Sequence, residues 1–270
     1  MLAEGISIFA WLCQAFSYSR PIGYHSCCLN GYLRLCFQNG EMRGVYWSLV
    51  LSTDTLAHSE CSSNREEGFQ MSELGKNIEE LAQQAVHDAS TIEDMVAKLE
   101  GSSRKQRQLA AAVLDAISRI DASGLTAYTD QLADALNRPE AQTRWECLDT
   151  MTNIVPLESR LCDKAIPGAE AALFDEENGL VRLAAMRFLC ALGATTENRS
   201  KKVWPLIDEG IQCYHGDPEF QEMLAAVVNF STGKLDAQVK EELKERMSFD
   251  AANAKGSLGK RAKLIVENLS

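Results

Sequence analysis

Hydrophobic residues recur at helical spacing through most of the chain after residue 71. In "RLAAMRFLCAL", which starts at Arg182, the third, fourth and seventh positions after the start are apolar. Segments that start at Arg107, Arg144 and Gln221 repeat this pattern, and the four starts are 37, 38 and 39 residues apart. Such spacing predicts the buried face of an amphipathic α-helix. The four apolar stripes are Ala110, Ala111, Leu114; Cys147, Leu148, Met151; Ala185, Met186, Leu189; and Leu224, Ala225, Val228.

A second amphipathic segment precedes each of these helices. The preceding segments are expected to end near Leu99, Leu136, Leu173, Ile211 and Met247. A looser final stripe, Ile265, Val266 and Leu269, completes the last pair. The repeating unit is therefore a helical hairpin of just under forty residues, present about five times. One such hairpin cannot bury its apolar faces alone, so the hairpins are expected to stack.

Polar residues mark where several of these helices are expected to begin. "STIE" predicts a capping box, in which Ser90 caps the helix and Glu93 reaches back to the Ser90 amide. Asn137 and Asp217 are predicted N-caps, each followed by a proline expected in the first helical turn. An additional helix from Ser72 to Asp88 is expected to cap the array at its N-terminal end.

One unit carries the residues of a recognisable repeat. "IPGAEAALFDEENGLVRLAAMRFLCALGA", Ile166 to Ala194, has Pro167 early in its first helix, Leu173 at that helix's end and Asp175 in the turn. It resembles a HEAT repeat, an armadillo-like unit, and Pro205 lies 38 residues after Pro167. The resemblance covers about residues 90–270. It implies an all-α protein of bacterial type: a right-handed α-α superhelix of about five HEAT-like hairpins with an N-terminal capping helix.

Residues 1–70 differ in composition from the rest. They contain 5 of the 9 Cys and no Lys, and they show no sustained periodicity. The apolar segment Ile6 to Phe16 lacks the basic flank of a signal peptide and is too short to span a bilayer. "REEG" just before Met71 is what a purine-rich ribosome-binding site would encode. We therefore predict that residues 1–70 are a spurious or unstructured extension and that the protein starts at Met71; a genuine disordered extension is the alternative.

Residues 71–270 contain no catalytic, cofactor or metal-binding motif that we recognise. They hold two His and four Cys, and "CYH" at 213–215 is the one Cys/His cluster, without a second pair at ligand spacing. Cys147 falls on an apolar stripe and is predicted to be a core thiol, whereas Cys190 falls off its stripe and is expected to be partly exposed. The predicted protein has no cofactor, and a bacterial cytoplasmic location is expected.

The repeat region is acidic, with 23 Lys and Arg against 32 Asp and Glu. A net charge of −9 disfavours binding to a phosphate backbone. This weighs against the DNA alkylation repair glycosylases built on HEAT-like repeats, although an enzyme of that kind, or a HEAT-like lyase, stays the alternative function. Arg144 and Arg182 occupy equivalent positions, and the resemblance implies that they pair with acidic residues of the turns between helices.

The resemblance also implies that the second helix of each hairpin lines the concave side. Residues on these helices that point away from the apolar stripe are then candidates for contact with a partner. Trp145 and Leu183 form an apolar step, which Asp115, Asp149 and Arg187 surround. Trp145 packing onto the neighbouring repeat is an equally weighted alternative. The sequence thus predicts a non-catalytic scaffold or adaptor that binds another protein, with neither nucleic acid nor membrane as a partner.

Overall fold

The computed structural model describes residues 26–29, 32–35 and 77–270, which belong to two separate compact units, 1–67 and 68–270. In the first unit, β1 (Ser26–Leu29) pairs antiparallel with β2 (Tyr32–Leu35), and Leu29 lies opposite Tyr32. The rest of the leader, and the predicted helix start at Ser72, lie outside the described residues. The start of the protein at Met71 stays a prediction.

Residues 77–270 form an all-α array. Residues 77–85 are helical, and Ala82 and Ala85 are buried. The hairpins that follow are α4 (Ala89–Glu100) with α5 (Arg104–Ile120); η2 (Ser123–Tyr128) and α6 (Thr129–Ala135) with α7 (Ala141–Cys162); η3 (Asp163–Ala165) and α8 (Ile166–Leu173) with α9 (Gly179–Gly193); α10 (Glu197–Cys213) with α11 (Phe220–Ser231); and α12 (Ala237–Asn253) with α13 (Gly256–Asn268). The five predicted hairpins are confirmed.

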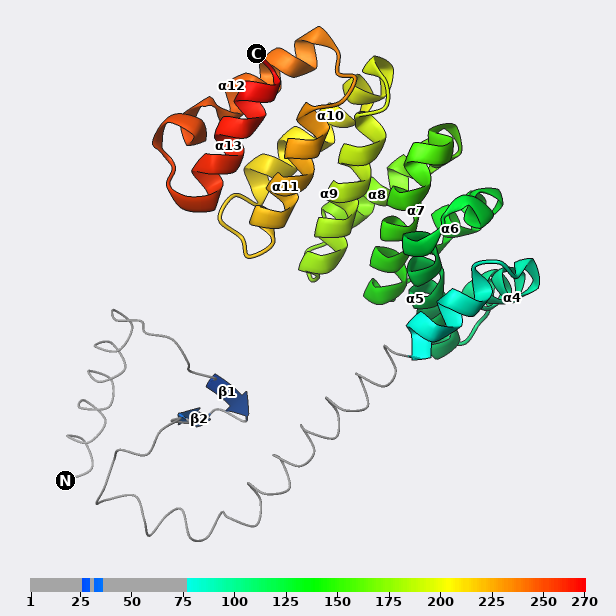
Figure 1. Cartoon of the computed structure of the whole chain (residues 1–270). Helices are drawn as coiled ribbons and strands as arrows, with labels where there is room; N and C mark the ends of the chain where they lie inside the picture. Colours follow the sequence, from blue (N-terminus) through cyan, green and yellow to red (C-terminus); the bar gives the residue numbers. More distant parts are fainter. Residues whose placement is uncertain (1–25, 30–31, 36–76) are drawn as a thin grey trace, which may run out of the picture. The chain divides into compact units, whose positions relative to one another are not determined.

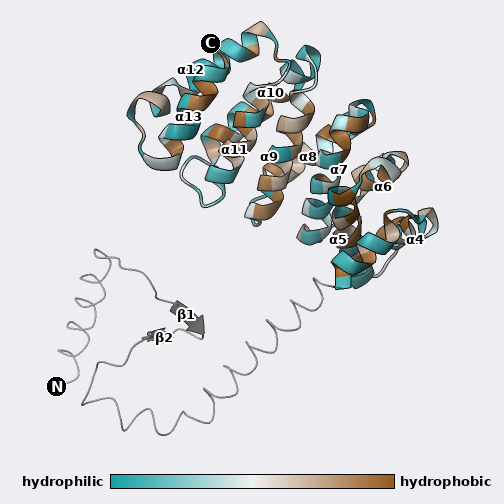
Figure 2. Cartoon of the chain, in the orientation of Figure 1, coloured by the Kyte–Doolittle hydropathy of each residue, from teal (hydrophilic) through white to brown (hydrophobic). Residues whose placement is uncertain are grey.

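The helices form two layers that follow the array (Figure 1). The second helices of the hairpins pack side by side in chain order, α5 on α7, α7 on α9, α9 on α11 and α11 on α13. The first helices α4, α6, α8, α10 and α12 make the other layer. Each helix alternates polar and apolar faces, which Figure 2 shows as teal and brown bands along the same ribbon. The apolar faces meet in one continuous core between the layers.

The predicted stripes occupy this core. All nine stripe residues of α5, α7 and α9 are completely buried. In α11 the buried residues are Met223, Leu224 and Val227, whereas Ala225 and Val228 are only partly buried. The fourth stripe therefore starts at Phe220 rather than Gln221, so the three repeat intervals are 37, 38 and 38 residues. The expected register in α11 was wrong by one residue.

The predicted capping residues were wrong, because a different, acidic residue stands directly before each of these helices. Asp88 caps α4 by accepting hydrogen bonds from the Ser90 amide (3.1 Å) and the Thr91 hydroxyl (2.6 Å), so Ser90 lies inside the helix. At α7 and α11 the residues before the helix are Glu140 and Glu219, not Asn137 and Asp217. Neither glutamate caps its own helix, since an arginine of the preceding repeat binds each carboxylate.

The last hairpin turns later than expected. The sequence placed the end of its first helix near Met247, but α12 continues to Asn253. The chain reverses at Ala254 and Lys255, and Gly256 then adopts φ +68°, a conformation that glycine tolerates better than other residues. The residues "SFDAA", expected to form the turn, are therefore helical. Among the helices of the described residues, none is long and apolar enough to cross a membrane.

Candidate partner-binding surface

The five residues predicted to contact a partner lie on three consecutive helices of the second layer. Asp115 is on α5, Trp145 and Asp149 are on α7, and Leu183 and Arg187 are on α9. Since α7 packs against both α5 and α9, the fold brings these distant positions onto neighbouring helices. The binding of a partner at these residues stays a prediction.

The exposure of these residues differs from the expectation. Asp115 and Leu183 were expected to face outwards, but they are only 6% and 7% exposed. Cys190, expected to be partly exposed, is buried. The reason is tertiary: α5, α7, α9 and α11 pack side by side, so neighbouring helices cover their flanks as well as the stripe that faces the first layer. Cys147 is buried, and its prediction as a core thiol is confirmed.

Trp145 lies between the two roles that the sequence allowed. Its side chain is partly buried and packs against the hydrophobic core, but it is not enclosed. A half-buried tryptophan offers a rigid apolar surface while staying anchored to its own domain. Trp145 can therefore both pack against its neighbours and offer surface to a partner.

Three carboxyl groups meet beside Trp145. Asp115 of α5 forms a hydrogen bond with Glu146 of α7, and Asp149 lies one helical turn after Glu146. Glu146 was not among the residues predicted from the sequence. Its spacing of three residues from Asp149 was the available signal, because residues i and i+3 share a helix face. We call the residues Asp115, Trp145, Glu146, Asp149 and Arg187 the α5–α7–α9 surface.

Two arginines partly balance these carboxylates. Arg119 Nη2 lies 3.3 Å from Asp115 Oδ2, and Arg187 Nη1 lies 3.8 Å from Asp149 Oδ1. Both guanidinium groups are substantially exposed, so solvent weakens their effect on the acids. The surface therefore contains three acids against two loosely held cations.

The carboxyl groups are harder to ionise than free acids. Burial raises the pKa of Asp115 to about 7, and the neighbouring Glu146 adds to the effect while Arg119 opposes it. Burial likewise raises the pKa of Asp149 to about 6, against the opposing charge of Arg187. The pKa of Glu146 is also raised, chiefly by burial. A cationic group placed here would favour the ionised forms, so this arrangement suits a lysine or arginine side chain.

The arginines that were expected to pair with acidic residues of the turns between helices form these pairs. Arg144 Nη2 donates to Asp175 (2.6 Å), and Arg182 donates to Glu219. Arg107, at the equivalent position of the first hairpin, binds Glu140. Each acid lies in or beside the turn between the helices of the next hairpin. The prediction for Arg144 and Arg182 is confirmed, and these side chains join repeats rather than face a ligand.

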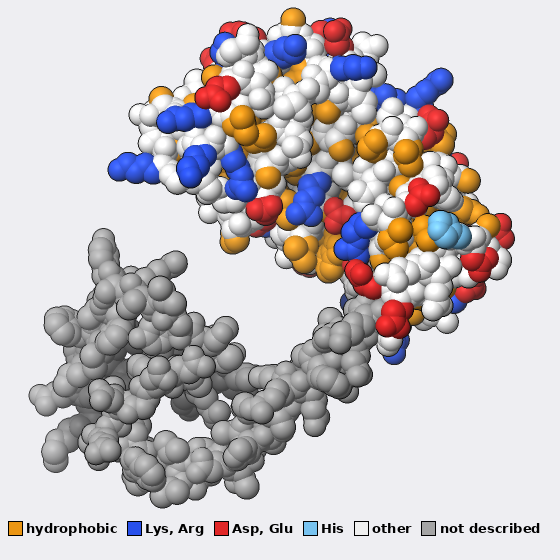
Figure 3. All heavy atoms as spheres, in the orientation of Figure 1, with side chains coloured by type: hydrophobic (Ala, Val, Ile, Leu, Met, Phe, Trp, Pro, Cys, Tyr) orange, Lys and Arg blue, Asp and Glu red, His pale blue; other side chains and the backbone are white. Residues whose placement is uncertain are grey.

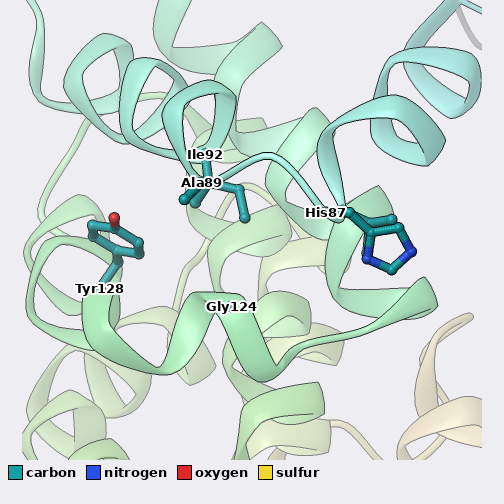
Figure 4. A pocket seen from close by; sticks show the side chains of 6 residues that line it. His87, Ala89, Ile92, Gly124 and Tyr128 are labelled. Atoms are coloured by element: carbon teal, nitrogen blue, oxygen red, sulfur yellow. The ribbon is translucent and has the colours of Figure 1, made fainter.

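Two cavities on the described residues lie elsewhere. One of about 170 Å³ is lined by Val86, His87, Ala89, Ile92, Gly124 and Tyr128, where the N-terminal end of the array meets η2 (Figure 4). Another, of about 160 Å³, lies between residues 79–83 and the end of α5. Pockets for drug-sized molecules are generally 300 Å³ or larger, so both are small. Among residues 77–270, no three acidic, His or Cys side chains are arranged to hold a metal ion.

Solved structures of designed and engineered proteins share this fold. A designed armadillo repeat protein in complex with the peptide (KR)4 superposes with a TM-score of 0.58 at 15% identity, covering 74% of this chain and 94% of that one. A computationally designed armadillo repeat protein for modular peptide recognition gives 0.53 at 16% identity, with the same coverage. An engineered protein gives 0.56 at 16% identity, covering 72% and 89% of the two chains. No protein-family model and no curated protein matches the sequence.

Proposed function

We propose that this armadillo/HEAT-like α-solenoid is a non-catalytic scaffold that binds an extended, lysine- or arginine-bearing segment of a partner protein. The α5–α7–α9 surface is the proposed binding site. The observation that carries the proposal is the meeting of Asp115, Glu146 and Asp149 beside the half-buried Trp145. Solenoids with this fold include designed proteins made to bind peptides, one of them in complex with a Lys-Arg peptide.

The charge balance of the surface supports a cationic ligand. The exposed guanidinium groups of Arg119 and Arg187 lie 3.3 and 3.8 Å from the carboxylates of Asp115 and Asp149. A bound basic side chain would add a further positive charge beside these acids. Its charge would lower the raised pKa values of Asp115 and Asp149, so ionisation of these acids and binding would favour each other. The exposed part of Trp145 would cover the aliphatic stem or stack on a guanidinium group.

The repeating geometry supports an extended ligand. Consecutive second helices present equivalent surface positions once per repeat, so a peptide that crosses them meets side chains at regular intervals. The array holds these helices in one continuous core, so the site is formed before the ligand arrives. Such preorganisation reduces the entropy lost on binding.

Fluorescence anisotropy with a labelled (Lys-Arg)4 peptide tests this proposal. The full chain should bind the peptide, and binding should weaken as salt is raised. The double variant Glu146→Gln, Asp149→Asn should weaken binding at least tenfold. The matched control is Glu176→Gln, Glu177→Gln, which removes two exposed charges from the turn before α9. Equal affinities for the site and control variants would show that the peptide responds only to net charge.

Trp145→Ala separates the binding role from the packing role. We expect weaker partner capture with little change in melting temperature. A large fall in melting temperature would identify Trp145 as a core residue instead. Affinity purification from the native cell should recover a partner with a basic segment; repeated recovery of the chain alone, across growth conditions, would contradict the scaffold proposal.

The absence of catalysis is part of the proposal, as is a bacterial cytoplasmic location. The alternative is a HEAT-like enzyme, such as a DNA-base glycosylase. Incubation of the full chain with a duplex that carries an alkylated base tests it directly. Base release by the wild-type chain that Asp115→Asn abolishes would overturn the non-catalytic assignment.

A further inference from the structure

The two ends of the array carry opposite charges. Residues 77–100, at the first end, contain six Asp and Glu but a single Lys. Residues 254–270, at the last end, contain four Lys and Arg but a single Glu. Figure 3 shows basic side chains gathered over the end formed by α13, while acidic side chains dominate around α4 at the other end. The acidity of the whole protein is therefore not spread evenly along the array.

The last end offers an uncovered helix face. Among the described helices, α13 makes its main contacts with α12 and α11. Lys255, Lys260 and Lys263 are exposed, and none of them forms an ion pair with a residue of the described chain. Leu264, beside Lys263, is also exposed. This face thus combines unpaired positive charge with apolar surface.

The first end offers the complementary charge. Glu80, of the helix at 77–85, and Glu93 and Asp94 of α4 are exposed. Lys98 pairs with Asp94 at 2.5 Å, and it is the one lysine of this segment. The segment keeps a net charge of −5 after that pairing. Glu93 and Asp94 are adjacent in α4, so these two carboxylates can act together on a cationic surface within a Debye length of about 8 Å.

We propose that a second copy of this chain docks its acidic first end, around Glu80, Glu93 and Asp94, onto the basic outer face of α13. A second copy is the occupant because the same chain carries both complementary surfaces, at opposite ends. Other anions, such as nucleic acid, would meet the same lysines but also the negative charge of the remaining array. The contact is independent of the α5–α7–α9 surface.

The proposed contact is head to tail. Each copy would use a different surface from its partner, so the association is heterologous and can continue beyond two copies. Exposed charges supply the attraction and the small apolar area of Leu264 adds little, so the contact should be weak and salt-sensitive. The mean mass of the protein should then rise with concentration at low salt.

Sedimentation velocity of the full chain tests the proposal at about 20 and 500 mM NaCl, which span strong and weak electrostatic interaction. We expect the weight-average mass to rise with protein concentration at low salt and to return to the monomer value at high salt. Lys255→Glu, Lys260→Glu, Lys263→Glu should abolish the rise. The matched control Arg160→Glu, Lys202→Glu, Lys234→Glu changes three exposed residues in the middle of the array by the same charge and should associate less than the wild type but more than the α13 variant.

A charge exchange makes the test specific for a second copy. Glu80→Lys, Glu93→Lys, Asp94→Lys gives a chain with two basic ends, and the α13 variant has two acidic ends. Each should be monomeric alone, and an equimolar mixture should associate again. A wild-type chain that stays monomeric at 20 mM NaCl would overturn the proposal. So would a mixture that stays monomeric, or binding of the α13 lysines to a DNA oligonucleotide in place of a second copy.

Discussion

Arg182 of α9 binds Glu219, 37 residues later, through two of its guanidinium nitrogens, with Nε 2.8 Å from the carboxylate. The same side chain donates through Nη1 to the Asp175 carbonyl (2.9 Å) and stacks over the Tyr214 ring, 4.9 Å from its centre. A single residue thus joins the turn of its own hairpin to the turn of the next one. Both partners of the ion pair are largely buried, so water does not screen the interaction strongly.

Truncating this arginine should destabilise the array. Arg182→Met leaves the Glu219 carboxylate buried without a cation, and we expect a loss of about 2–4 kcal/mol in the free energy of unfolding. Urea denaturation followed by circular dichroism measures it. The double variant Arg182→Met, Glu219→Leu should recover part of the loss, because it leaves no unpaired charge. Additive losses in the double variant would contradict this account.

Asp115 should make stability depend on pH. Its pKa is raised from 3.8 to about 7 by burial, so between about pH 4 and pH 7 the folded protein binds more protons than the unfolded one. Stability contributed by Asp115 therefore falls as pH rises through this window. Asp115→Asn should raise the melting temperature by a few degrees at pH 8 relative to wild type, and much less at pH 5. Asp134→Asn, which makes the same change at an exposed position of α6, is the matched control.

Gly233 should not tolerate a side chain. A Cβ atom at this position would lie 2.6 Å from Ala194 Cα and 2.7 Å from its carbonyl oxygen, and a backbone cannot move aside as a flexible side chain would. Lys234 N also donates to that carbonyl (2.8 Å), which fixes the approach. Gly233→Ala should cost about 2 kcal/mol or more. Gly216→Ala, where a Cβ meets nothing within 4 Å but φ is +98°, isolates the backbone cost alone and should be milder.

The four cysteines of the array should differ in reactivity. Cys213 is exposed, whereas Cys147 and Cys190 are buried, and burial raises the pKa of both buried thiols well above its ordinary value. Because the thiolate is the reactive form, iodoacetamide at pH 8 should label Cys213 while the array is folded. Peptide mass spectrometry reads the sites. Equal labelling of Cys147 without denaturant would show that α7 opens locally.

The sequence by itself determined the repeat and its core. The apolar stripes of α5, α7 and α9 are buried as predicted, because helical periodicity already specifies which face must leave water. The arginine series was also legible, since Arg107, Arg144 and Arg182 start equivalent segments. These features depend on local spacing, which one chain displays in full.

The tertiary structure decided where two of the helices begin and which flanking residues are buried. Both features depend on residues of the neighbouring repeats. Glu140 and Glu219, not Asn137 and Asp217, directly precede their helices, and arginines of the previous repeat bind both carboxylates. Asp115 and Leu183 are buried because adjacent helices cover their flanks, and the same packing brings Glu146 against Asp115. The particular partners in such contacts lie about 30 to 40 positions apart, and only the stacked array brings those residues together.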